Sequence, residues 1–160
     1  MAEREHIPAR VSKWLMKSEP GTFSIDDLKK QKTTRWDGVR NYQARNFMQA
    51  MEVGDEVLFY HSSADPSGVA GVARISQIAE PDATALNKNH PYYDSKSTPE
   101  KPIWFAVEVE FKQKFLSLIT LSQLRSTNGL EDLMVLKKGQ RLSVQPLSEN
   151  HYTRILKLAT

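Results

Sequence analysis

The stretch "IWFAVEVEF" at residues 103–111 is the clearest strand signal in the chain. Large apolar side chains occupy every second position, and Trp104, Ala106, Glu108 and Glu110 stand between them. Successive side chains of a strand point to opposite faces, so this alternation predicts a strand with one apolar face. The expected core side of the strand consists of Ile103, Phe105, Val107, Val109 and Phe111.

The flanking segments predict an α+β fold. Strands are expected over 14–17, 54–62, 67–80 and 137–148, and helices over 24–30, 41–51, 120–126 and 148–159, with Ser24 and Ser148 as helix caps. Residues 81–102 hold four prolines, which predicts a long loop of a kind that is often functional. Because strands outnumber helices without β–α–β alternation, we expect a small curled or barrel-like sheet. The expected core includes Phe47, Met51, Phe105, Val107, Val109, Ile155 and Leu156.

Composition is that of an ordinary globular protein of 160 residues. We expect a flexible N-terminal arm over 1–12 and one domain over 13–160. The sequence has no apolar run long enough for a membrane span and no secretory signal, so no membrane partner is expected. It has no cysteine, which excludes a thiol nucleophile, a cysteine-based zinc site and disulfides. The net charge of +3 is compatible with nucleic-acid binding without requiring it.

The stretch "RWDGVRNYQAR" at residues 35–45 combines groups that stack on rings, hold anions and form directed hydrogen bonds. In the expected helix from Asn41, the core face falls on Ala44, Phe47, Met48 and Met51. Tyr42 then points away from the core, with Asn41 and Arg45 on one flank and Arg40 beside them. A helix start favours anions, so this corner could hold a phosphate, and Gly38 allows a close backbone approach.

Structural alternatives stay open for these residues. Trp36 could cover the edge of the core, and Arg45 could pair with Asp37 on the surface. Trp104 lies on the strand face opposite the large apolar residues, where it either walls a pocket or covers a second small core. Trp14, at the start of the first expected strand, fits the core.

Five segments of the chain together resemble the EVE domain family: "WLMKSEP", "WDGVRNYQARNFM", "GDEVLFYHS", "GVAGVARI" and "KPIWFAVEVEF". They occur in the family's order between about residues 13 and 158. The resemblance implies a PUA-like fold, with a mixed, mostly antiparallel barrel-like sheet surrounded by helices. It also implies kinship with the ASCH and YTH domains, and a function in binding nucleic acid that carries a modified base. The expected base is a modified cytosine in DNA, although RNA stays open.

Carried onto this chain, the family's pocket motifs fall on Trp14, Lys17, Ser18, Glu19, Trp36, Gly38, Val39, Arg40, Asn41, Tyr42, Arg45, Tyr60, His61, Ser62 and Trp104. A base held out of its stack needs aromatic walls and polar groups along its edge. Trp36, Tyr42, Tyr60 and Trp104 could be the walls, and Ser18, Glu19, Asn41 and Ser62 could contact the edge. Lys17, Arg40 and Arg45 could hold phosphates. We expect no cofactor or metal, a monomer, and a cytoplasmic (bacterial) or nuclear location.

Two other functions stay open. A hydrolase of modified nucleosides, as in the ASCH group, could use Lys17, Ser18 and Glu19. However, His61 and Ser62 are neighbours in an expected strand and point to opposite faces, which argues against a direct His–Ser pair. His6, His61, His90 and His151 lack the spacing of metal ligands. The other alternative is a protein-interaction module, which no exposed apolar segment supports.

Overall fold

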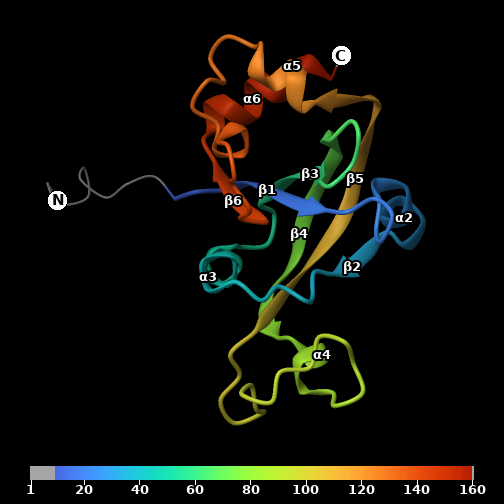
Figure 1. The fold of residues 1–160 in the computed structure, drawn as a ribbon, viewed down its shortest axis with the longest axis vertical. Helices are drawn as coiled ribbons and strands as arrows, with labels where there is room; N and C mark the ends of the chain where they lie inside the picture. Colours follow the sequence, from blue (N-terminus) through green and yellow to red (C-terminus); the bar gives the residue numbers. More distant parts are fainter. Residues whose placement is uncertain (1–9, 160) are drawn as a thin grey trace, which may run out of the picture.

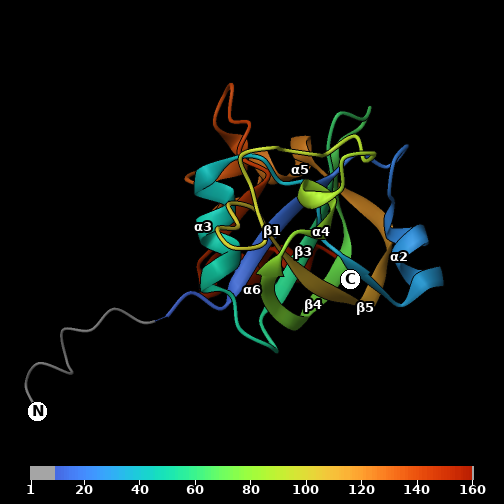
Figure 2. The same ribbon diagram turned by 90° about the horizontal axis from the view of Figure 1, so that it is seen from below.

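The computed structural model describes residues 10–159, so His6 and residues 1–9 of the predicted arm lie outside the described part. One six-stranded sheet, in the order β2-β5-β4-β3-β1-β6, carries helices on both sides (Figures 1 and 2). The strands are β1 (Lys13–Ser18), β2 (Thr33–Arg35), β3 (Glu56–His61), β4 (Gly68–Pro81), β5 (Phe105–Thr120) and β6 (Val144–Leu147). The helices are α2 (Ile25–Gln31), α3 (Tyr42–Ala50), α4 (Ala83–Leu86), α5 (Leu121–Arg125), α6 (Glu149–Leu158) and the 3-10 turn η1 (Met134–Leu136).

The predicted fold class is confirmed. The β1–β3 pair is parallel and the other four strand pairs are antiparallel. Within the described residues the strand order ends at β2 and β6, so the curled sheet is open. Three elements were not predicted from the sequence: the three-residue strand β2, which pairs with β5, the short helix α4 inside the expected loop, and the 3-10 turn η1. No helix in the described range is long and apolar enough to cross a bilayer.

Of the predicted strand over 103–111, residues 105–111 form the first half of β5, which pairs with β4 along the long axis of the molecule (Figure 1). Val107 and Val109 are buried as expected, but Trp104 and Ala106 of the opposite face are buried as well. Phe105 and Phe111 are only partly buried. The alternation therefore located the strand correctly but did not predict that both of its faces are covered.

Two apolar clusters explain this burial. Trp14 and Met16 belong to the cluster that includes residues of α2 and α3, whereas Leu15 joins the cluster that includes residues of α5 and α6. Because side chains alternate along a strand, β1 contributes to both clusters. Its sequence is therefore continuously apolar from Trp14 to Met16. Of the predicted core residues, Met51, Val107, Val109 and Ile155 are buried, whereas Phe47, Phe105 and Leu156 are only partly buried.

Side-chain caps fix the starts of three helices. Ser24 caps α2 in a capping box with Asp27, and Ser148 caps α6, as predicted. Asn41 caps α3 by accepting a hydrogen bond from the Ala44 amide at 2.9 Å. These caps satisfy backbone N–H groups that would otherwise lack partners.

Gly71 marks a close approach of β4 to β5 and gives a test of the sheet packing. A Cβ atom there would collide with the carbonyl oxygen of Gln113 and crowd Ile25. Gly71→Ala should therefore lower the free energy of unfolding by about 1–3 kcal/mol, the usual cost of overpacking. Gly21→Ala is the matched control, because its Cβ would meet no atom within 4 Å. Urea denaturation checks both variants, and equal stabilities would contradict this packing.

Candidate functional site

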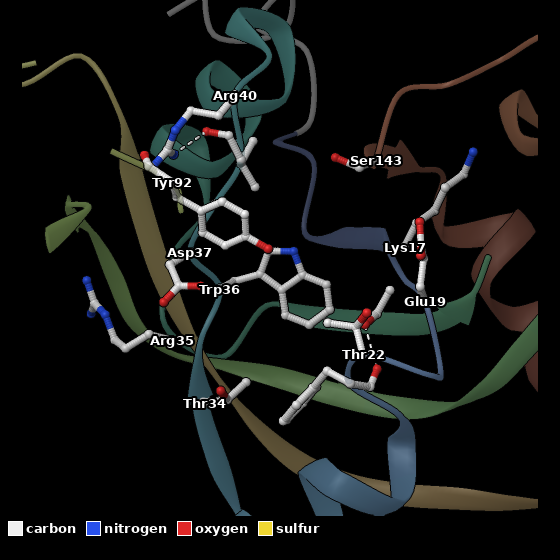
Figure 3. Close-up of a pocket in the computed structure, with 14 residues that line it drawn as sticks. Lys17, Glu19, Thr22, Thr34, Arg35, Trp36, Asp37, Arg40, Tyr92 and Ser143 are labelled. Atoms are coloured by element: carbon white, nitrogen blue, oxygen red, sulfur yellow. Dashed lines mark hydrogen bonds between the residues drawn. The ribbon is translucent and has the colours of Figure 1, made fainter. Parts of the chain in front are cut away.

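A cavity of about 570 Å³ opens beside Trp36, at the end of β1 (Figure 3). Its size lies in the range of small-molecule sites, roughly 300–1,000 Å³. Its lining consists of Lys17, Ser18, Glu19, Thr22, Phe23, Thr34, Arg35, Trp36, Asp37, Gly38, Val39, Arg40, Tyr92 and Ser143. These residues come from the end of β1, the turn before α2, the segment around β2, the loop after α4 and the segment before β6.

Trp36 is both a core residue and a wall of the cavity. Its ring packs edge-on against Phe59, with the ring centroids 5.5 Å apart, and its amide donates to the Val107 carbonyl at 2.8 Å. Only 9% of the residue is exposed. Trp36 was expected either to cover the edge of the core or to form a wall of the site. It does both, since the ring is anchored in the core and also lines the cavity.

Asp82 holds the segment after Trp36 in place. Its carboxylate accepts from the Gly38 amide at 2.9 Å and from Arg40 Nη1 at 3.0 Å, and its side chain is fully buried. Thr84 donates to the other carboxylate oxygen through its amide and its hydroxyl. Burial alone would raise the pKa of this carboxyl, but the hydrogen bonds from Thr84, Gly38 and Arg40 together hold its pKa below the usual value.

Tyr92 brings the long loop over the cavity. A Cβ atom on Gly38 would come within 2.5 Å of the Tyr92 ring, so the ring packs where only glycine leaves room. Gly38 also has φ +79°, a conformation that glycine adopts at no steric cost. Arg40 donates to the Tyr92 carbonyl at 2.6 Å and lies 5.8 Å from the centre of its ring. The predicted functional loop thus supplies one wall.

A second group of predicted residues gathers at the start of α3, outside the cavity lining. Tyr42 and Trp104 stack with centroids 5.0 Å apart, so the two residues meet despite their separation in the sequence. Arg45 lies 4.9 Å from the Tyr42 ring and donates to the Ile103 carbonyl, not to Asp37. The side chain of Arg40, which lines the cavity, lies 5.5 Å from the Trp104 ring and connects the two groups.

The remaining predicted residues have other surroundings. Trp14 is buried and donates to Asp55 at 3.0 Å, and Asn41 is the cap of α3. The Nε2 atom of His61 accepts from the Ile25 amide at 3.1 Å, and burial lowers the pKa of His61. Tyr60 and Ser62 line a different cavity of about 640 Å³. Seven of the fifteen predicted residues line the Trp36 cavity, and they are Lys17, Ser18, Glu19, Trp36, Gly38, Val39 and Arg40.

Charged groups of both signs stand at the cavity. Lys17 Nζ donates to the Gln140 carbonyl at 3.2 Å, and burial lowers the pKa of Lys17. Asp37 is an exposed residue whose carboxyl is partly enclosed; that burial, followed by the charge of Asp82, raises the pKa of Asp37. Figure 3 shows Lys17 and Glu19 on one side of the cavity and Asp37 on the other. The site can therefore offer both hydrogen-bond donors and acceptors to a bound molecule.

Several lining residues were not predicted from the sequence: Thr22, Phe23, Thr34, Arg35, Asp37, Tyr92 and Ser143. Asp37 lies inside the quoted stretch 35–45 and could have been included for its position alone. The adjacent tyrosines at 92 and 93, in an otherwise polar loop, were a weak signal. Ser143 reaches the cavity only through tertiary pairing, since its carbonyl accepts from the Lys17 amide.

Comparisons with known proteins agree on one family. The EVE domain family model matches residues 12–158. Human thymocyte nuclear protein 1 is 45% identical over 165 residues, which cover 92% of this chain and 73% of that protein. A Pseudomonas putida protein of known structure has a TM-score of 0.90 and 48% identity, over 92% of this chain and 99% of that one. The crystal structure of human THYN1 protein in complex with 5-methylcytosine containing DNA has a TM-score of 0.85 and 44% identity, over 92% and 97%.

The Asp82 carboxylate makes a testable contribution to stability. Asp82→Asn should lower the free energy of unfolding at neutral pH by about 3–5 kcal/mol, because it leaves the half-buried Arg40 without its ionic partner. Since the folded pKa of Asp82 lies below the ordinary value of 3.8, its contribution is present above about pH 4 and is lost as the pH falls through the folded value. Denaturation across this range should show the two proteins converging in acid. A constant difference in stability would contradict the ion pair.

Proposed function

The chain belongs to the EVE domain family, and from that premise we propose that it is a non-catalytic reader of modified cytosine in DNA. The modified base lies in the cavity beside Trp36. The observation that carries this proposal is the cavity itself, where an anchored aromatic ring faces charged and polar groups at the end of β1. The 5-methylcytosine DNA in the crystal structure of the human relative supports the choice of base.

The walls suit a flat ring. Trp36, Tyr92 and Phe23 give the cavity aromatic surface from three separate segments. Stacking of a base on one aromatic side chain contributes roughly 1–3 kcal/mol. A base in a duplex is already stacked, so it enters such a cavity only by rotating out of the helix. The aromatic contacts offset part of the cost of unstacking.

The edge of the base meets the charged groups. Cytosine presents an exocyclic amino group, for which Asp and Glu carboxylates are suitable acceptors. Asp37 and Glu19 are the two carboxylates of the lining, and Lys17 is a donor for the ring nitrogen or carbonyl of cytosine. The Ser18 hydroxyl donates to the Phe23 carbonyl at 2.5 Å, so it is left as an acceptor.

The other predicted site residues take supporting parts in this proposal. Gly38, Val39 and Arg40 shape the cavity backbone, and Arg40 holds the Tyr92 wall. Tyr42, Arg45 and Trp104 brace the loop next to the cavity, with Trp104 donating to Asp94 at 2.7 Å. The walls of the cavity are thus held in place by packing before the base binds, which reduces the conformational entropy lost on binding.

The hydrolase alternative draws no support from this geometry. Ser18 donates to a backbone carbonyl, Lys17 donates to Gln140, and His61 accepts from a backbone amide. None of these hydrogen bonds connects a nucleophilic side chain to a general base, as covalent catalysis would require. Within residues 10–159 no group of acidic or histidine side chains is arranged to hold a metal ion.

Preference for the modified base tests the proposal directly. A short duplex with one central 5-methylcytosine should bind more tightly than the unmodified duplex, by roughly 10–200-fold, the limit for one methyl-sized contact. Tyr92→Ala should weaken the modified duplex by about 1–3 kcal/mol, since one stacking wall is lost. Tyr93→Ala is the matched control, because Tyr93 is similarly exposed but lies outside the lining. Fluorescence anisotropy measures all four affinities, and equal affinity for the two duplexes would refute the reader function.

The Asp37 carboxylate predicts a dependence on pH. It accepts most strongly from the amino group of cytosine when ionised, and burial raises its pKa above the ordinary value. Affinity should therefore fall as the pH is lowered through this raised pKa, while the chain stays folded. Asp37→Asn should bind both duplexes more weakly and lose this pH dependence. An unchanged pH profile in the variant would exclude Asp37 as the acceptor.

A further inference from the structure

The cavity of about 640 Å³ that contains Tyr60 and Ser62 adjoins the Trp36 cavity. Lys17, Glu19 and Ser143 line both, so the two hollows meet at the end of β1. The second cavity is far more basic. Five cationic side chains line it, against the single carboxylate of Glu19, and they are Lys17, Arg125, Lys137, Lys138 and Arg141.

The chain places these charges from three separate elements. Arg125 ends α5, and Lys137, Lys138 and Arg141 lie in the "KKGQR" segment between η1 and β6. This segment is attached to β1 through Lys17, whose amide donates to the Ser143 carbonyl and whose ammonium donates to the Gln140 carbonyl. The basic cavity therefore has a fixed position relative to the Trp36 cavity.

Four of the five cations have no partner within the described residues. The side chains of Arg125, Lys137, Lys138 and Arg141 make no hydrogen bond or ion pair there. Some cations elsewhere are paired, as in Lys13–Glu56 and Lys114–Asp26, while others such as Lys29 and Lys30 form no ion pair with any described residue. What distinguishes these four is that they gather around one hollow. Gathering unpaired like charges around a hollow disfavours folding, and it concentrates a positive potential that attracts anions.

We propose that the second cavity binds the phosphodiester backbone of the DNA strand whose modified base occupies the Trp36 cavity. This inference rests on the proposed function, and it places base and backbone on either side of Lys17. Lysine and arginine side chains, hydroxyls and backbone amides are the usual phosphate contacts. The cavity adds the hydroxyls of Ser62, Ser63 and Ser67 to its cations.

The same observations reassign the phosphate contacts expected from the sequence. Arg40 donates to Asp82, Val39, Thr84 and Tyr92, and Arg45 donates to Asn46 and Ile103. These two guanidinium groups are occupied within the protein. Of the three cations first expected to hold phosphate, Lys17 alone lines the basic cavity.

The test is a salt titration with charge-neutral variants of the basic segment. Lys137→Gln, Lys138→Gln and Arg141→Gln are combined in one protein, since these side chains are exposed and make no contact that the fold requires. The matched control is Lys29→Gln/Lys30→Gln at the end of α2, where two exposed lysines line neither cavity. Each protein is titrated with modified and unmodified duplexes between about 50 and 200 mM salt. The nucleoside 5-methyldeoxycytidine, which has no phosphate, is titrated in parallel.

The slope of log affinity against log salt should fall by about 0.9 for each side chain that contacts a phosphate. Both duplexes should weaken by the same factor, because phosphate contacts carry no base information. Nucleoside affinity should stay unchanged. An unchanged slope, an equal effect in the control, or a parallel loss of nucleoside binding would each overturn the assignment. If the unaltered chain shows no preference for the modified duplex, the reader function fails, while a reduced slope in the triple variant still supports the backbone site.

Discussion

The buried carboxylate of Asp82 is the constraint on which the candidate site depends. It joins the end of β4 to the segment after Trp36 and, through Thr84, to the start of α4. Its own amide donates to the Trp104 carbonyl at 2.8 Å, which fixes the far end of the long loop. A buried charge is tolerated only with good partners, so these contacts stabilise one arrangement and disfavour others. The position of Gly38 follows from this network directly, and that of Tyr92 follows through Arg40.

This network also separates the residues that build the site from those free to bind a ligand. Arg40 lies at the cavity, yet its hydrogen bonds go to a carboxylate, a hydroxyl and two carbonyls of the protein. The cations of the "KKGQR" segment are the reverse case, since they are exposed and unpaired among the described residues. Motif composition cannot distinguish these cases, because an arginine that braces a loop and one that holds a phosphate look alike in a sequence. The role of an arginine depends on its partner, and the carboxylate partner of Arg40 is Asp82, 42 positions away in the sequence.

Local signals in the sequence predicted most elements and some of the site. The caps Ser24 and Ser148 and the alternation in 103–111 depend on near neighbours, and the structure contains the corresponding helices and strand. The strand β2 has three residues and no apolar pattern, so its pairing with β5 could not be predicted locally. The wall formed by Tyr92 depends on the space above Gly38, a contact between distant segments. The alternation of side chains along a strand could have separated two of the predicted site residues. Tyr60 and His61 are neighbours in β3, so their side chains face opposite sides of the sheet.

The parallel pairing of β1 with β3 explains why two cavities meet at one place. Parallel strands end at the same edge of the sheet, and here Ser18 is aligned with His61. Before that edge, alternate side chains of β1 are buried in the two apolar clusters, as Met16 and Leu15 show. Beyond it the clusters end, and side chains directed to either face reach solvent. Lys17 stands at this point and lines both cavities. A strand end covered on both faces can therefore present two adjoining hollows of different chemistry, one aromatic and one basic, as a flipped base and its phosphates would require.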